Sequence, residues 1–426
     1  MRLWLLLTVL PLFALAQDDA WDDSSWDEGW DDEEQEQAWS GYVEAGVGRR
    51  FDNDPLIDTS STLQELRVRA ETEWQGDRYT IGLRADAGYD GVIEDWFIDV
   101  RDLSVAFTVG EQTDVAIGRQ VQTWGTGDLL FLNDLFPKDF VSFFSGRDAE
   151  YLKAPGNAIR ITRFSDSINV DFVWTPVFEP DLYLTGERFS FFSPVAGGNI
   201  APEPPLSAVE PDKSFSNGEF ALRFFRTVEG REFALYAYRG FFKQPTAQTE
   251  DLRPTFAPMQ SFGGSFRRPL GPGLFNAEFS YYDSRDDRGG TNPLIPNDQF
   301  RALVGYEWEA RSNFTVGLQY YMEWTLDHDK LLANSQFPDL EVAEFRQLLT
   351  NRLTYRAGMG RFNWSLFTFY SPTDDDFHIR PRLTYRHSDR WSMSLGGNLF
   401  GGSESHTFFR QLQDASNAYL RLRFHY

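Results

Sequence analysis

The sequence predicts an all-β fold, namely a transmembrane antiparallel β-barrel of about 18 strands, with about 16 as the alternative count. Two observations support this fold. Apolar and polar residues alternate in segments of about ten residues along most of the 426-residue chain, which is the period of a strand with two different faces. The connections between these segments alternate between short and long, as in barrels that span an outer membrane.

The composition excludes several other classes of protein. The chain has no cysteine, which excludes a disulfide framework, a thiolate metal site and a cysteine nucleophile. Its formal charge of -24 and pI near 4.6 argue against nucleic acid as a partner, because phosphate binding needs a basic surface. No histidine pair has metal-ligand spacing, and phosphate-loop and dinucleotide motifs are absent from the sequence. We therefore expect no cofactor and no metal site.

Residues 1–16 form the first element in the chain. They combine Arg2, a short apolar run and the ending Ala14-Leu15-Ala16, which together are typical of a secretory signal peptide cut after Ala16. A buried N-terminal helix is the alternative. No later stretch reaches the roughly 18 apolar residues of a membrane helix, so any further membrane contact has to be made by strands.

Residues 17–39 form a separate acidic region. They contain eleven Asp or Glu residues, four tryptophans and no Lys or Arg. Losing Arg2 with the leader changes the charge from -24 to -25, and this region accounts for -11 of it, which leaves -14 for residues 40–426. Charges this dense repel one another, so we expect a disordered periplasmic tail. It is either a solubilising leader or a docking segment for a periplasmic partner.

The strands of the barrel occupy residues 40–426. In one clear case Leu66 and Val68 alternate with Glu65, Arg67 and Arg69, and the same pattern recurs along the chain. The eighteen predicted strands are 41–51, 62–75, 78–89, 98–109, 113–123, 156–164, 167–175, 216–227, 231–241, 258–268, 273–283, 298–309, 313–325, 343–356, 361–370, 376–386, 390–400 and 416–426.

The faces of these strands could suit either a soluble barrel with an apolar interior or a membrane barrel with a wet lumen. Long connections near 52–61, 124–155, 176–215, 242–257, 284–297, 326–342 and 401–415 favour the membrane barrel, with short turns on the periplasmic rim. We therefore expect contact with outer-membrane lipid and lipopolysaccharide. Tryptophans near strand ends are expected at the lipid–water interface: Trp74, Trp174, Trp308, Trp324, Trp364 and Trp391.

Two short segments resemble known outer-membrane proteins. The ending Tyr419-Leu-Arg-Leu-Arg-Phe-His-Tyr426 resembles the C-terminal strand that the barrel-insertion machinery reads in bacterial outer-membrane proteins. The stretch Ile117-Gly-Arg-Gln-Val-Gln-Thr-Trp-Gly-Thr-Gly-Asp128 is similar to a segment of porin-like families, including uncharacterised ones and the alginate-export type. The resemblance implies the outer membrane of a Gram-negative cell, a porin-like channel and the insertion machinery as a partner.

The connection 124–155 combines aromatic residues with paired opposite charges. In general porins, which the chain resembles in the order of its loops, the third outer loop folds into the lumen. We hypothesise that this segment narrows the pore, and the alternative is a salt-bridged extracellular cap. The residues expected to face the path or to fasten the loop to the wall are Asp128, Lys138, Arg147, Asp148 and Lys153.

Arginines on the polar faces of the strands near the closing seam suggest a basic wall. Guanidinium groups in a pore attract anions, although arginine and glutamate could instead pair across strands and stabilise the barrel. The predicted pore-lining residues are Arg67, Arg69, Arg84, Arg352, Arg356, Arg380, Arg382, Arg386, Arg421 and Arg423.

These patterns favour a channel for small solutes, anionic ones in particular, and not an enzyme. Export or uptake of a polysaccharide or a hydrophobic compound shares the same architecture and is the first alternative. A second is an outer-membrane hydrolase that uses His328, which lies between Asp327 and Asp329. A third is a structural barrel that anchors a periplasmic partner through the acidic tail.

Overall fold

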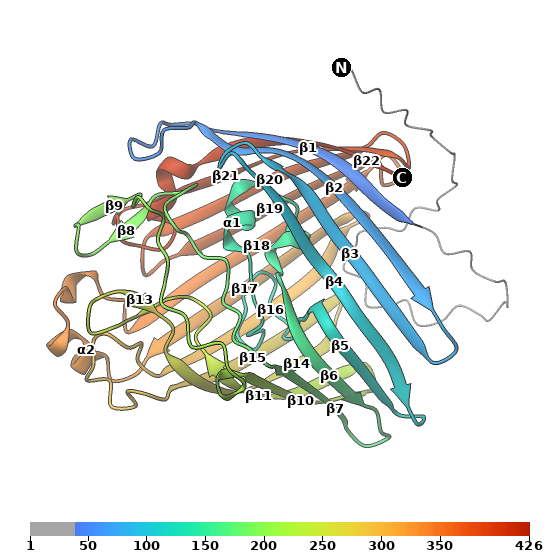
Figure 1. Cartoon of the computed structure of the whole chain (residues 1–426), viewed down its shortest axis with the longest axis horizontal. Helices are drawn as coiled ribbons and strands as arrows, with labels where there is room; N and C mark the ends of the chain where they lie inside the picture. Colours follow the sequence, from blue (N-terminus) through green and yellow to red (C-terminus); the bar gives the residue numbers. More distant parts are fainter. Residues whose placement is uncertain (1–38) are drawn as a thin grey trace, which may run out of the picture.

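Eighteen antiparallel strands close into one barrel in a computed structural model that describes residues 39–426 (Figure 1). The predicted signal peptide 1–16 and all of the acidic tail except Trp39 lie outside the described residues. The barrel strands are β1 (Ser40–Arg50), β2 (Ser61–Gln75), β3 (Tyr79–Asp90), β4 (Asp95–Val109), β5 (Thr113–Val121), β6 (Pro155–Arg163), β7 (Asn169–Thr175), β10 (Glu219–Val228), β11 (Arg231–Phe241), β14 (Pro258–Leu270), β15 (Gly273–Ser284), β16 (Gln299–Arg311), β17 (Phe314–Thr325), β18 (Phe345–Ala357), β19 (Phe362–Ser371), β20 (Asp376–Arg386), β21 (Trp391–Gly402) and β22 (Asn417–His425).

Each barrel strand pairs with its neighbour in the chain, and the first pairs with the last. The register of β1 and β22 runs from Tyr42 opposite His425 to Arg50 opposite Asn417, which closes the sheet without a free edge at the seam. All eighteen predicted strands are present, with ends shifted by a few residues; the segment expected at 216–227, for example, begins at Glu219. The prediction of an 18-stranded antiparallel barrel is therefore confirmed.

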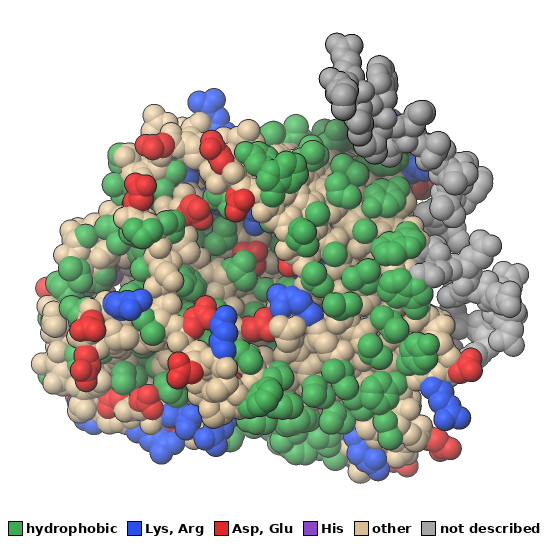
Figure 2. All heavy atoms as spheres, in the orientation of Figure 1, with side chains coloured by type: hydrophobic (Ala, Val, Ile, Leu, Met, Phe, Trp, Pro, Cys, Tyr) green, Lys and Arg blue, Asp and Glu red, His purple; other side chains and the backbone are tan. Residues whose placement is uncertain are grey.

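The two faces of the strands settle which side is apolar. On β2 the side chains of Leu66 and Val68 are 55% and 41% exposed, whereas the alternating Arg67 and Arg69 are each 4% exposed. Figure 2 shows hydrophobic side chains gathered on the outer surface over β2 to β4. A soluble barrel would bury this apolar face, so the exposed apolar band is that of a membrane barrel.

Aromatic residues border this band. Trp324 stacks on Phe345 with ring centroids 5.2 Å apart, and Trp391 lies 4.9 Å from Phe424. Both tryptophans are exposed close to the ends of their strands, as is Trp364. Amphipathic rings at these positions suit the interface between lipid and water.

The long connections carry the remaining elements. Residues 122–154, hereafter the L3 segment, contain α1 (Phe140–Ser145) and the 3₁₀ turn η1 (Ala149–Leu152). Residues 176–218, hereafter the L4 segment, contain β8 (Phe191–Ser193), β9 (Gly198–Ile200) and η2 (Phe215–Asn217). Other connections hold β12 (Ala247–Gln248), β13 (Pro254–Thr255), α2 (His328–Asn334), η3 (Pro338–Leu340) and η4 (Arg410–Ala415). Within residues 39–426, the helices are all too short or too polar to cross a membrane.

The main buried cluster lies inside the barrel. It joins Phe143 and Phe144 of α1 to inward side chains of the wall, including Phe367 on β19 and Phe400 on β21. Figure 1 shows α1 within the ring of strands. The apolar core is therefore formed by the L3 segment against the wall rather than by two packed sheets.

Candidate pore interior

The L3 segment crosses the barrel interior from one wall to the other. Near its start, Glu278 of β15 accepts hydrogen bonds from the backbone N–H groups of Thr126 and Asn133, at 2.7 and 3.0 Å. Near its end, the carboxylate of Glu150 lies 2.6 Å from the guanidinium of Arg69 on β2. Because these wall side chains point inward, the contacts place the segment inside the barrel and not over its rim.

Local sequence signals shape the L3 segment. Asp139 caps α1, since its carboxylate accepts a hydrogen bond of 2.7 Å from the N–H of Ser142. The helix ends at Gly146, which has a φ of 96° in the left-handed region that favours glycine. Asp148 then caps η1 through the N–H of Glu150. The short helix thus presents its aromatic side chains on a defined face.

The C-terminal end of α1 is fastened to the wall. The carbonyl oxygen of Phe144 accepts hydrogen bonds from Asn398 of β21 and Asn417 of β22, at 3.0 and 3.1 Å. The guanidinium of Arg380 lies 3.8 Å from the ring centroid of Phe143 and donates to its carbonyl oxygen at 3.3 Å. These donors satisfy backbone acceptors that the end of a helix leaves free.

Tyr151 forms a second attachment on the opposite side of the segment. Its hydroxyl donates to the carboxylate of Asp86 on β3 and lies 2.5 Å from the hydroxyl of Tyr42 on β1. The guanidinium groups of Arg67 and Arg101 lie over its ring, 4.2 and 4.6 Å from the centroid. A buried tyrosine ring between two guanidinium groups gains from cation–π attraction as well as from packing.

Asp86 is the central carboxylate of this attachment. Its side chain is fully buried and lies 2.7 Å from both Arg67 and Arg69. A buried carboxylate is tolerated only when charge and hydrogen bonds compensate its lost hydration, and here two guanidinium groups and one phenol do so. Sequence reasoning missed Asp86, although its place on the polar face of β3 was readable from the alternation.

The five predicted loop residues all make polar contacts inside the barrel. Asp128 binds Arg352 of β18 through both carboxylate oxygens, one of them at 2.6 Å. Arg147 reaches β2 and β3, where it lies 2.8 Å from Glu65 and 2.7 Å from Asp90. These two contacts fasten the segment to the wall at widely separated strands.

The other three predicted loop residues hold the segment together or to the seam. Lys138 lies 2.9 Å from the carboxylate of Asp134, and Lys153 contacts Asp134 at 3.9 Å and the hydroxyl of Thr123. Asp148 contacts Arg421 of β22 at 2.9 Å. Burial alone would raise the pKa of Asp148, but the guanidinium groups of Arg421 and Arg423 hold its pKa well below the usual range.

Four of the predicted pore-lining arginines do not face an open path, which corrects the prediction for them. Arg67, Arg69, Arg421 and Arg423 are at most 8% exposed and lie beneath the L3 segment. Their guanidinium groups pair with carboxylates inside the barrel, because unpaired charges could not be held there. Besides Asp86, these partners are Glu44, Glu65 and Asp148. The alternative of cross-strand ion pairs therefore describes this part of the wall.

Arg84 and Arg352 are also paired. Arg84 lies 2.7 Å from Glu71 in a partly exposed pair between β3 and β2, and Arg352 binds Asp128 as described above. Neither guanidinium is an independent positive charge toward the lumen.

The four remaining arginines share two strands of the barrel wall. We name Arg356, Arg380, Arg382 and Arg386 the basic strip; all four lie on the inward phase of β18 and β20. Arg380 donates to neutral oxygens of Asn398 and Phe143, and within residues 39–426 no carboxylate lies within ion-pair distance of Arg382. The strip runs from α1 to the periplasmic ends of its strands, where Arg356 and Arg386 are exposed.

The L4 segment also folds into the barrel, which sequence reasoning did not predict. Arg188 pairs with Asp90 and donates to the carbonyl oxygen of Thr62 at 2.8 Å, and Phe189 is buried. Two backbone hydrogen bonds join this segment to L3. The N–H of Leu182 donates to the carbonyl oxygen of Lys138, and the N–H of Phe140 donates to the carbonyl oxygen of Leu182. A signal was present, because residues 187–192 mix charge and aromatic residues much as L3 does.

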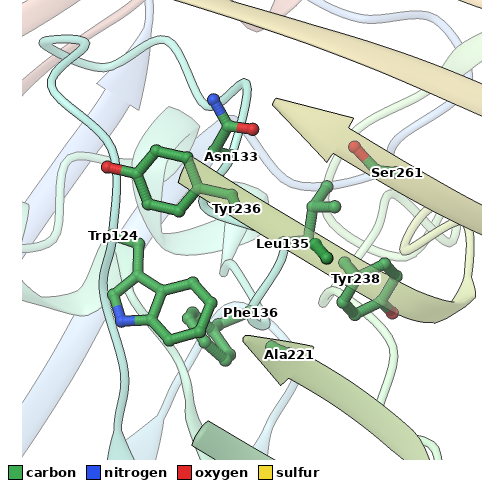
Figure 3. Close-up of a pocket in the computed structure, with 9 residues that line it drawn as sticks. Trp124, Asn133, Leu135, Phe136, Ala221, Tyr236, Tyr238 and Ser261 are labelled. Carbon is green, nitrogen blue, oxygen red and sulfur yellow. The ribbon is translucent and has the colours of Figure 1, made fainter. Parts of the chain in front are cut away.

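A small pocket beside L3 is filled by packing rather than open to a ligand. Figure 3 shows Trp124 and Phe136 of L3 lying against Tyr236 of β11. The centroid of the Trp124 ring lies 5.0 Å from that of Phe136 and 6.0 Å from that of Tyr236. The space left in this pocket is about 10 Å³. That volume holds at most one water molecule, so this is a structural contact.

His328, the candidate for a hydrolase, lies at the start of α2 on an outer loop. Its Nε2 atom lies 2.8 Å from the backbone carbonyl oxygen of Val342. Residues 39–426 contain no cluster of three or more side chains that could hold a metal ion.

The fold and its interior define the class of the protein, a porin-like β-barrel of outer-membrane type. No protein-family model matches the sequence, and no curated protein matches it either. Solved structures with the same fold include OccAB1 and OccAB3 of Acinetobacter baumannii, each 11% identical with a TM-score of 0.52. The match covers 91% and 92% of this chain and 95% and 99% of those chains, respectively.

OccK5 (OpdH) of Pseudomonas aeruginosa is similar to the same degree, with 11% identity and a TM-score of 0.51 over 92% of this chain and 97% of that one. At such low identity the likeness extends to the barrel fold alone. The particular function of this chain therefore has to be argued from its own interior.

Proposed function

We propose that the protein is an outer-membrane channel for diffusion of small anionic solutes, narrowed by the L3 segment. The observation that carries this proposal is the path of L3, which is fastened by charged contacts to Glu278 and Arg352 on one side and to Arg69 on the other. A segment held at both walls reduces the open cross-section that a solute can use.

The basic strip supports the preference for anions. Arginines that pair with buried carboxylates add little net positive potential to the pore. Within residues 39–426, Arg380 and Arg382 have no carboxylate within ion-pair distance, so their positive charge acts on the interior. Guanidinium groups beside a narrowed, low-dielectric path attract anions and can bind carboxylate or phosphate in bidentate fashion. The solute would pass L3 and then follow the strip toward the periplasmic mouth.

The same proposal includes export and insertion. Residues 1–16 would act as the cleaved signal peptide, and the C-terminal strand β22 would be read by the insertion machinery. The described contacts of L3 serve to hold a loop in place, and we assign the protein transport rather than catalysis.

Deletion of residues 129–150 tests the proposal. We expect the single-channel conductance of the purified protein in a planar bilayer to rise several-fold, because the segment across the interior is removed. A deletion of residues 286–291, at the exposed tip of the β15–β16 connection, is the matched control and should leave conductance unchanged. Circular dichroism should show the strand content of an intact barrel for both variants. Unchanged conductance after removal of 129–150 would refute the constriction.

A further inference from the structure

The barrel wall has a gap beside the outer half of β4. Pairing between β4 and β5 begins only at Leu103 opposite Arg119, whereas β4 itself begins at Asp95. Among residues 39–426, residues 95–102 thus have β3 on one side and no strand on the other, and Figure 1 shows this part of β4 extending beyond β5. At membrane depth an unpaired strand edge is tolerated only where protein or a water-filled cavity covers it.

A cavity of about 640 Å³ lies at this gap. Asp99 and Arg101 line it from the inner face of β4, opposite the outward side chain of Ile98. Arg119 and Asn157 line it from the outer face, because they lie in register with Leu103, which is 54% exposed toward lipid. A cavity lined by both faces of a sheet passes through the wall.

The neighbouring apolar residues place this opening at the level of the outer leaflet. Ile98 and Trp96 are 81% and 77% exposed on the lipid side of the same stretch of β4. Trp96 also packs on Tyr89 of β3, with ring centroids 5.2 Å apart, as an interfacial aromatic pair does. Apolar chains of outer-leaflet lipids would therefore reach the rim of the cavity.

The lining of the cavity is polar and acidic. Arg101 donates to the carbonyl oxygens of Glu150 and Lys153, and Arg119 donates to that of Val100 and pairs with Glu179 at 3.1 Å. Both arginines are thus occupied by the protein. The cavity has three cationic side chains, the third being Lys213, against five carboxylates: Asp99, Asp139, Glu179, Asp181 and Glu210. Four of these carboxylates are engaged by the protein: Asp99 pairs with Arg101 at 3.4 Å, Asp139 caps α1, Glu179 pairs with Arg119, and Asp181 accepts hydrogen bonds from Lys138 and Gln244. Among the described lining residues, the exposed Glu210 is the carboxylate left to a ligand, which suits a cationic or hydroxyl-rich group and disfavours a phosphate.

We propose that this opening is a side portal that receives the head group of an amphiphile from the outer leaflet. The head group is cationic or hydroxylated, and the apolar chain lies along Trp96 and Ile98. Backbone groups on the edge of β4, together with the carboxylate of Glu210, bind the head group. The portal is separate from the path along the basic strip and does not depend on it.

Single cysteines test access through the wall, because the natural chain has none. The full-length barrel in liposomes would carry Asp99→Cys, with Ile98→Cys as the lipid-facing control and Ser394→Cys as an inward control on a fully paired strand. With a maleimide attached to a lipid chain, we expect Asp99→Cys to react at least tenfold faster than Ser394→Cys. Rates for a water-soluble maleimide correct for intrinsic reactivity. Equal corrected rates would overturn the portal, and protection of Ile98→Cys would show a second copy of the chain on this edge instead.

Competition at Asn157→Cys tests the head group, since this variant keeps all five carboxylates. Dodecyl maltoside and dodecyltrimethylammonium should slow labelling several-fold, and dodecyl phosphate should not. Glu210→Lys should weaken protection by the ammonium amphiphile and leave protection by the maltoside unchanged. Equal protection by the phosphate, no protection by any of the three, or an unaltered ammonium effect in Glu210→Lys would each overturn the assignment. Neither assay reads conductance, so failure here is distinguishable from failure of the channel proposal.

Discussion

At the scale of single residues, buried carboxylates stabilise the barrel interior by pairing with arginines of the wall. Asp86 is fully buried between Arg67 and Arg69, and its carboxylate also accepts a hydrogen bond from the hydroxyl of Tyr151. Without this carboxylate, two guanidinium groups would remain buried with less compensation than their lost hydration requires. The residue therefore stabilises the wall and the end of L3 together.

Asp86→Asn should lower the free energy of unfolding by about 3–5 kcal/mol, the usual result of removing one partner from a buried ion pair. Urea titration of the detergent-solubilised barrel, followed by circular dichroism, measures it. Glu71→Gln is the control, because its pair with Arg84 is partly exposed and is worth about 0–1 kcal/mol. Equal losses in the two variants would contradict the central role of Asp86.

At the scale of elements, L3 is a short helix and a turn held by charges from distant strands. Asp148 connects it to Arg421, and its pKa is held well below the usual range. A carboxyl whose pKa falls on folding stabilises the docked state above its unfolded pKa of about 4, and this contribution is lost as pH falls toward the lower folded value.

Conductance in a planar bilayer should therefore stay constant between about pH 8 and pH 5 and rise below about pH 4, as L3 loosens from the seam. Asp148→Asn should show the looser, higher-conductance state already at neutral pH, with a weaker response to acid. A conductance change between pH 8 and pH 5 in the natural protein would count against this account, since Asp148 stays ionised throughout that range.

At the scale of the whole molecule, the proposed basic path is opposite in sign to the net charge. Residues 40–426 carry -14, yet many of the acidic groups inside the barrel are paired with arginine, whereas within residues 39–426 no carboxylate lies within ion-pair distance of Arg380 or Arg382. Coulomb attraction falls with distance and with salt, so a solute inside the narrowed path responds to the nearest groups rather than to the total.

The reversal potential in a KCl gradient should accordingly show a preference for chloride. Arg382→Gln should reduce the permeability ratio by about two- to fivefold, because one charge at close range in water is worth about 1 kcal/mol. Arg231→Gln removes the same charge beside the β10–β11 turn and should change little. Cation selectivity of the natural protein would contradict the anion path.

The fold and the L3 segment could be predicted from the sequence, because both follow from local patterns of residues. The alternation of Leu66, Arg67 and Val68 determines which face of β2 meets lipid, since side-chain direction in a strand has a period of two residues. Repeated along the chain, that pattern with its short and long connections was sufficient for the 18-stranded barrel. The aromatic and charged composition of L3 was likewise sufficient to single it out.

The sequence by itself thus determined the fold, the outward and inward faces and the candidate loop. Only the tertiary structure decided that Arg421 meets Glu44 across the seam, that Arg188 brings L4 inside, and that β5 stops short of the outer half of β4. The physical reason is that face direction is a property of each strand alone. Ion-pair partners, loop docking and gaps depend instead on strand register and on contacts between residues far apart in the chain.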